Sequence, residues 1–159
     1  AVISYSGNFE GVDVGLTYGR LQGNTEISAG SEYNDLDAQV YSVRVAAAGF
    51  TAIYKNHTYG DSGLIKSDTV DGDGEGSVYA VRYDMGNFSL GYVHTETSIK
   101  ISTNAAESSA ETDTFGLGYN LGGGVMIEFA HGSIEETGGA DSLKDTEADI
   151  TLAKLSFGF

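Results

Sequence analysis

The sequence contains no cysteine, no proline and no tryptophan, and it carries only 8 Lys+Arg against 23 Asp+Glu. Without cysteine there is no disulfide, no thiolate catalysis and no cysteine-ligated zinc. The net charge of -15 repels any polyanion, so we expect no nucleic-acid partner. No stretch approaches the ~20 apolar residues of a transmembrane helix, and no signal-peptide pattern opens the chain.

Glycine and aromatic residues are abundant instead. The 159 residues include 23 Gly, 10 Tyr and 7 Phe. Glycine is unfavourable inside a helix, and the bulky apolar residues of this chain, mainly Val, Ile, Tyr and Phe, favour strands. The length allows one domain or part of one. We therefore predict an all-β fold in which residues 1–159 form a single unit.

Apolar residues alternate with small or polar residues at a period of two, which is typical of strands with two different faces. In the run FGLGYNL, Phe115, Leu117 and Tyr119 share one side, opposite Gly116 and Gly118. This pattern predicts about nine strands. They lie near Val2–Ser6, Val12–Leu21, Ala38–Ala48, Phe50–Tyr59, Ser77–Met85, Phe88–Lys100, Thr114–Asn120, Val125–Ile134 and Ala148–Phe159.

The predicted connections alternate between short and long. The short ones, GNFEG, AAGF, MGNF and LGGG, all contain glycine, as tight hairpins require. The long ones, at about 22–35, 59–76, 101–112 and 135–147, hold many of the acidic residues, and we expect them all at one end of the sheet. The hairpins ISYSGNFEGVDVGLTYG and VRYDMGNFSLGYVHT also resemble each other around Gly-Asn-Phe, which predicts a repeated hairpin unit with that turn.

The face opposite the bulky residues is rich in Gly, Ala and Ser. Such a face suits the inner wall of a membrane barrel better than the surface of a soluble sheet. Closing the sheet would also remove edges that lipid cannot solvate. Aromatic residues gather near the predicted strand ends, as the girdles of such barrels do. These are Tyr5, Phe9, Tyr18, Phe50, Tyr59, Tyr83, Phe88, Tyr119 and Phe159.

The end of the chain carries a family resemblance. The segment ADITLAKLSFGF, with Ala153, Leu155, Phe157 and Phe159 in alternation, is similar to the terminal strand of bacterial outer-membrane β-barrel proteins. Together with Tyr-rich hairpins such as RYDMGNFSLGYVHT, it makes the chain resemble a Gram-negative general porin of the alphaproteobacterial type. The resemblance implies an up-and-down antiparallel transmembrane barrel of sixteen strands. It also implies contact with outer-membrane lipid, a homotrimer, and a constriction loop inside the pore.

The chain departs from that family in length, because a porin is about twice as long. Nine strands also place the two chain ends on opposite sides, which does not close as an even-numbered barrel. We therefore expect the C-terminal portion of a porin, whose remaining N-terminal part is a further partner and holds the constriction loop. The alternative is a complete eight-stranded outer-membrane barrel in which residues 1–9 are a periplasmic lead-in.

Charged residues in the inward phase are the candidate pore-lining residues, because fixed charges along a pore set its preference for anions or cations. The alternative is that they form internal salt bridges that fill a small lumen. These residues are Arg44, Lys55, Arg82, Asp84, Glu128 and Lys154.

The run TVDGDGEG places Asp71, Asp73 and Glu75 at alternate positions with glycine between them. Hard oxygen ligands on a flexible turn suit Ca²⁺, although the run lacks the length of an EF-hand loop. The alternative is a solvated acidic loop. We expect no other metal and no cofactor.

The leading functional expectation is a water-filled channel for passive diffusion of small hydrophilic solutes and ions. We expect no enzyme, because neither a GxSxG nor an HExxH motif is present. The alternative function is a small structural or adhesive barrel with a filled lumen and partner-binding loops. Large side chains or dense ion pairs on the inner face would favour that alternative, whereas glycine and serine favour the channel.

Overall fold

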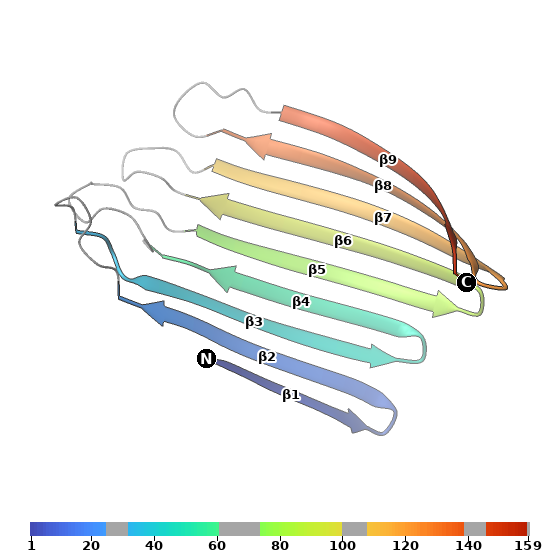
Figure 1. Cartoon of the computed structure of the whole chain (residues 1–159), viewed down its shortest axis with the longest axis horizontal. Coiled ribbons are helices and arrows are strands. Elements are labelled where there is room, and N and C mark those ends of the chain that lie inside the picture. The colour runs from blue at the N-terminus through green and yellow to red at the C-terminus, as the bar shows by residue number, and fades with distance from the viewer. Residues whose placement is uncertain (25–31, 61–73, 100–107, 139–145, 159) are drawn as a thin grey trace.

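The computed structural model describes residues 1–24, 32–60, 74–99, 108–138 and 146–158. These residues form nine strands in one antiparallel sheet whose spatial order is the sequence order (Figure 1). The strands are β1 (Val2–Phe9), β2 (Val12–Gly23), β3 (Leu36–Ala47), β4 (Phe50–Thr58), β5 (Gly74–Met85), β6 (Phe88–Ile99), β7 (Ser108–Gly122), β8 (Val125–Thr137) and β9 (Thr146–Phe157). The described residues include no helix that is long and apolar enough to cross a membrane.

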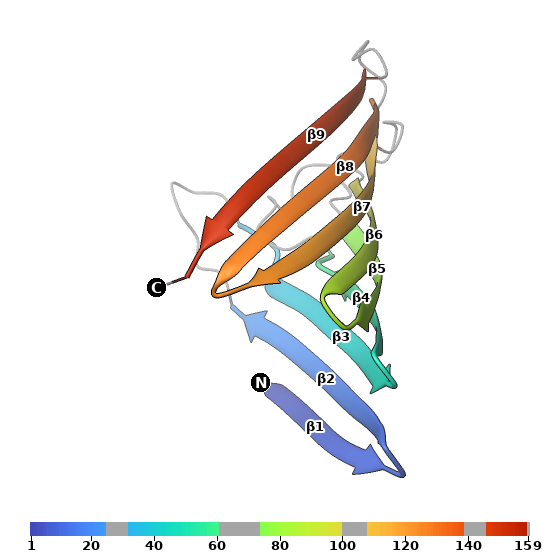
Figure 2. The ribbon, with the colours of Figure 1, turned by 90° about the vertical axis from the view of Figure 1, so that its right-hand side faces the viewer.

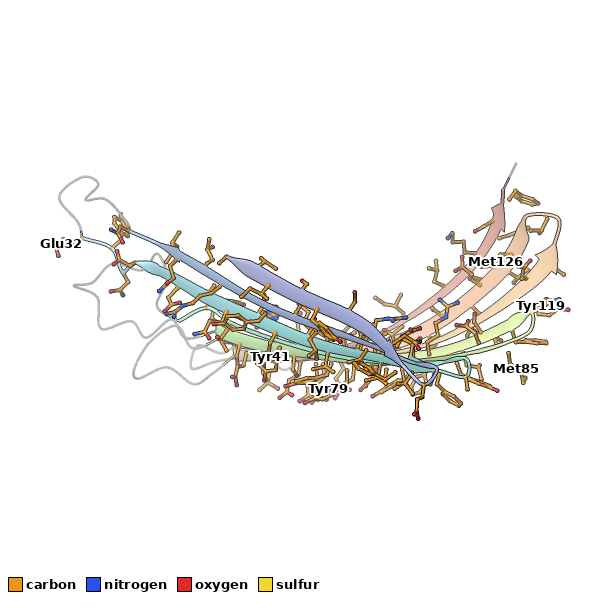
Figure 3. The ribbon with its side chains drawn as sticks, turned by 90° about the horizontal axis from the view of Figure 1, so that it is seen from below. Glu32, Tyr41, Tyr79, Met85, Tyr119 and Met126 are labelled. Atoms are coloured by element: carbon orange, nitrogen blue, oxygen red, sulfur yellow. The ribbon has the colours of Figure 1, made fainter. Side chains whose placement is uncertain are left out.

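The predicted all-β, up-and-down arrangement of nine strands is confirmed. The eight-stranded alternative is wrong, because residues 2–9 are a strand that pairs with β2 from Val2 opposite Gly19 to Phe9 opposite Val12. The sheet is not closed: β1 and β9 are its two edges and do not pair with each other. Figure 2 shows the strong twist between its N-terminal and C-terminal halves, and Figure 3 shows the sheet as a trough with a concave and a convex face.

The short turns lie at one end of the sheet, and the strand ends that flank the long connections lie at the other end, as predicted (Figure 1). Each short turn contains glycine with a positive φ, at Gly11, Gly49, Gly86 and Gly123. We call their end of the sheet the turn end and the opposite end the loop end.

The prediction of a repeated Gly-Asn-Phe turn is wrong. Between β5 and β6, Gly86 and Asn87 form the turn. In the first hairpin the Gly-Asn-Phe sequence is instead the end of β1, and the turn is Glu10–Gly11. The shared letters therefore occupy different structural positions.

Strand β7 differs most from its predicted bounds, since it begins at Ser108 rather than near Thr114. Its first residues, SSAETD, are polar or small on both faces, so they show no hydrophobic alternation. Backbone pairing extends the strand, with Ser109 opposite both Ser98 on β6 and Thr137 on β8.

The described residues form no buried hydrophobic core. Leu90 is 55% exposed and Phe115 is 60% exposed, although both are large apolar side chains. A single curved sheet has no second layer against which such residues can pack. The apolar face therefore needs an apolar neighbour outside the described sheet.

Candidate functional site

The cross-strand register assigns each residue to one of the two faces, because directly opposite residues project to the same side of a sheet. The aromatic face is convex and the glycine-rich face is concave. Figure 3 shows Tyr41, Tyr79 and Met85 on the convex side and Met126 on the concave side.

An apolar band covers the turn-end half of the convex face. On β2 it consists of Val12, Val14, Leu16 and Tyr18, which extend over ~20 Å of strand. The corresponding positions of β1, β3, β4 and β5 carry no charged residue. On β6 to β9 the band is narrower, because the row of Leu16 continues to Asp113 and Asp149 and the row of Tyr18 continues to four glutamates. Such a band is the kind of surface that lipid solvates.

Rows of aromatic rings border this band on both sides. Near the turn end, Phe50 stacks on Tyr83 with ring centroids 4.1 Å apart. At the other border, Tyr54 lies between Tyr41 and Tyr79, with centroid distances of 5.8 and 4.9 Å. Tyr41, Tyr54 and Tyr79 had not been predicted as girdle residues, since they lie in the middle of their strands in the sequence.

Tyr59 does not belong to either row, in contrast to the prediction. Its ring stacks on His57 at a centroid distance of 5.6 Å. His57 lies opposite Gly76 and Val40 in the concave phase, so Tyr59 belongs to that face. Phe159 lies outside the described residues.

The convex face becomes strongly acidic on the loop-end side of the band. Glu96, Glu111, Glu135 and Glu147 lie directly opposite one another across β6 to β9. Like charges in opposite positions are destabilising. We call this set the glutamate row.

An ion pair lies on the same side of the band at β2 and β3. Arg20 and Asp37 approach to 2.9 Å, and the hydrogen bond that Arg20 donates lowers the pKa of Asp37 below its usual value. Both groups lie beyond Tyr18 and Tyr41, outside the apolar band.

The concave face has a floor of small residues in its C-terminal half. Gly91 lies opposite Gly116, and Gly116 lies opposite Ala130, across β6, β7 and β8. A groove of about 320 Å³ runs over this floor, with Arg82 on one bank and Lys154 on the other.

All six predicted pore-lining residues lie on the concave face. The structure brings four of them together in two pairs: Arg82 with Asp84 at 2.7 Å, and Lys154 with Glu128 at 2.9 Å. The Arg82 and Lys154 side chains are 62% and 60% exposed, so these pairs lie open on the surface.

Arg44 and Lys55 stand apart from those pairs. Each is exposed and forms no ion pair with the described residues. Lys55 lies opposite Ser42, and Arg44 lies opposite Ile53. The two cations are therefore diagonal neighbours on β4 and β3.

Two features of the concave face were missed by the sequence reading. Asp13 lies on the concave face and accepts a hydrogen bond from Asn8 at 2.7 Å. This contact could not be predicted, because it depends on the turn being at Glu10–Gly11. Ile150 and Leu152, each 56% exposed, give β9 large apolar residues on its concave face as well as on its convex face.

The calcium prediction stays a prediction. Asp71 and Asp73 lie outside the described residues, and Glu75 begins β5 on the convex face opposite Thr58 and Ser98. Within the described ranges, no three His, Asp or Glu side chains are grouped so that they could hold a metal ion.

The chain was compared with protein-family models, curated proteins and solved structures. No family model, no curated protein and no solved structure matches the chain. What the two faces can do must therefore be argued from the chemistry of their residues.

Proposed function

We propose that this chain forms part of the wall of an outer-membrane porin, a water-filled channel for passive diffusion of small hydrophilic solutes and ions. The convex face would meet lipid and the concave face would line the water. The observation that carries the proposal is the separation of chemistry between the two faces: an uncharged apolar band on one, and glycine, serine and charged residues on the other.

The exposed apolar side chains support the lipid assignment. Leaving them in water costs about 25 cal/mol for each Å² of apolar surface. A lipid surface would remove that cost without a second protein layer. The aromatic rows at both borders match the positions where tyrosine and phenylalanine meet the membrane interface.

The concave floor supports an open lumen rather than the structural or adhesive alternative. A Cβ atom added at Gly91 or Gly116 would meet no atom closer than 3.8 Å. Packing within the sheet therefore does not require glycine at these positions. A filled barrel would place large side chains there, whereas glycine leaves space for water above the floor.

Closure of the barrel is part of the proposal. Strands β1 and β9 both run toward the turn end, so direct pairing between them would be parallel. Antiparallel closure needs an odd number of further strands, which the remaining part of a porin would supply. Outer-membrane localisation and assembly into a homotrimer belong to the same proposal.

Two neighbouring positions on β6 test which face meets lipid. Leu90 lies in the apolar band, and Ser89 lies on the concave face beside Gly118. Leu90→Lys should reduce the amount of native protein assembled in the outer membrane, because a cation that faces lipid costs from ~1 kcal/mol near the interface up to ~2–4 kcal/mol at the midplane. Ser89→Lys, the matched control, should assemble and alter conductance in planar bilayers.

The opposite result would contradict the proposal. If Leu90→Lys assembles at the native level while Ser89→Lys fails, the concave face is the one that is packed. A native protein that assembles but conducts no ions in planar bilayers would support the filled barrel instead.

A further inference from the structure

The basic residues of the described strands differ in whether they form ion pairs. Of the five cations in the described strands, Arg20, Arg82 and Lys154 each pair with a carboxylate. Arg44 and Lys55 do not pair with any described residue. Asp13 is a diagonal neighbour of Arg44 on the concave face, but it accepts a hydrogen bond from Asn8 and forms no ion pair with Arg44. Because the sequence has 23 acidic against 8 basic residues, two adjacent cations that form no ion pair with a described carboxylate need an explanation.

The two cations are close enough to act on one ligand. They occupy diagonal positions on adjacent strands, which places their Cα atoms about 7–8 Å apart on the same face. Both side chains are long and exposed, so the guanidinium and the ammonium can converge over Ser42 and Ile53.

A line of hydroxyl groups extends from Lys55 toward β1. Ser42 lies directly between Lys55 and Thr17, and the Thr17 hydroxyl is 3.3 Å from that of Ser4. On the same β2 side, Arg44 lies opposite Gly15, which has no side chain to cover it. The patch therefore offers two positive charges, several hydroxyl donors and free space.

We infer that Arg44, Lys55, Ser42 and Thr17 form an oxyanion-binding subsite for phosphate and small phosphate monoesters. The planar guanidinium matches two oxygens of such a group. A phosphate monoester supplies three acceptor oxygens and about -1.5 to -2 charge at pH 7, enough to engage both cations. Chloride has a single charge and cannot span the two groups in this way.

The inference rests on the proposed function, because the subsite faces the channel only if the concave face lines it. In that setting the ligand is a dissolved solute rather than a lipid phosphate, since the apolar band lies on the other face. Phosphate-bearing solutes would then bind at β2 to β4. The ion pairs of β5 to β9, whose charges cancel, would not take part in binding.

The first experiment measures chloride current through the native protein in planar bilayers while inorganic phosphate is added. Phosphate should reduce the current at millimolar concentration, and dimethyl phosphate, with one charge, should do so at least fivefold less effectively. Arg44→Gln and Lys55→Gln should each weaken the phosphate block at least fivefold, whereas Lys55→Arg should retain it. Arg20→Gln removes the same charge on the convex face and should leave the block within twofold.

A second measurement separates the subsite from the channel. Phosphorus NMR on the native protein in detergent micelles should show broadening of the phosphate signal that Arg44→Gln and Lys55→Gln abolish. If that broadening occurs but no conductance is found, the subsite stands and the proposed channel fails. If the channel conducts and phosphate neither blocks it nor broadens, or if Arg20→Gln weakens binding equally, the subsite inference is overturned and the channel stands.

Discussion

Replacement of Gly49 by any other residue should be strongly destabilising. It forms the β3–β4 turn with a φ of 86°, and an added Cβ would lie 2.5 Å from the backbone oxygen of Asp84. The same oxygen belongs to a residue whose amide donates to Gly49. Neither the backbone conformation nor the contact can be relieved without moving the next strand.

Gly49→Ala should therefore destabilise the protein more than Gly11→Ala. Gly11 has the same φ of 86° but nothing within 4 Å of its added Cβ, so it pays only the left-handed strain of ~1–2 kcal/mol. Urea unfolding of the native protein and of the two variants in detergent micelles measures both losses of stability. Equal midpoints for the two variants would show that the contact with Asp84 is absent.

The pair between Arg20 and Asp37 gives a pH prediction. Because the pKa of Asp37 is lowered in the folded state, its contribution to stability is present above the usual aspartate value of ~4 and is lost as the pH falls through the lowered value. Asp37→Asn should lower the melting temperature slightly at pH 7 and have less effect at pH 3. A mutant difference that grows on acidification would contradict the pair.

Much of the residue-level site could be predicted from alternation alone. The phase of Arg82, Glu128 and Lys154 placed them on one face, and the structure agrees. What alternation could not give is register, since a pattern of period two does not say which residue of the next strand lies opposite. The diagonal relation of Arg44 and Lys55 depends on that register and was not predicted.

At the level of elements, each predicted strand exists, and the errors are at the ends. Strand β7 begins six residues earlier than the sequence pattern indicated, because its polar start shows no alternation. The same effect hid the glutamate row, because Glu111, Glu135 and Glu147 were assigned to long connections, and only Glu96 was placed inside a predicted strand. Hydrophobic periodicity finds the part of a strand that has an apolar face and misses the part that does not.

The Phe50–Tyr83 contact should contribute to the pairing of β4 with β5. The rings are 4.1 Å apart and inclined by 25°, a geometry worth ~0.5–1.5 kcal/mol beyond area burial. Phe50→Ala and Tyr83→Ala should therefore couple by that amount in a double-mutant cycle of urea unfolding. A control cycle between Phe50 and Leu16, which is on β2, should give no coupling. A coupling near zero for the first pair would mean that the rings do not stack.

For the whole molecule, the fold class and the order of strands follow from the sequence, whereas closure does not. Alternation and glycine turns specify hairpins between neighbours in sequence. Pairing of the two edge strands would join residues far apart in the sequence, and no local sequence pattern specifies such contacts. The described sheet therefore confirms the up-and-down order of the nine strands, and closure into a barrel stays a proposal.

Orientation in the membrane is the prediction at this scale. If the loop end faces the exterior, protease added to intact cells should cut within residues 59–76 or 135–147. It should spare the turns at Gly49, Gly86 and Gly123, which would lie on the periplasmic side. Cleavage at those turns in intact cells would invert the orientation.

The glutamate row has a consequence for how copies of the molecule share a membrane. In the proposed orientation it forms a line of fixed negative charge just outside the lipid, where the convex faces of neighbouring copies approach each other. The range of their repulsion is the Debye length, ~30 Å at 0.01 M salt and ~3 Å at 1 M. The spacing of a two-dimensional lattice of this protein should accordingly shrink as monovalent salt is raised, and charge-neutral Gln at Glu96, Glu111, Glu135 and Glu147 should make that spacing insensitive to salt.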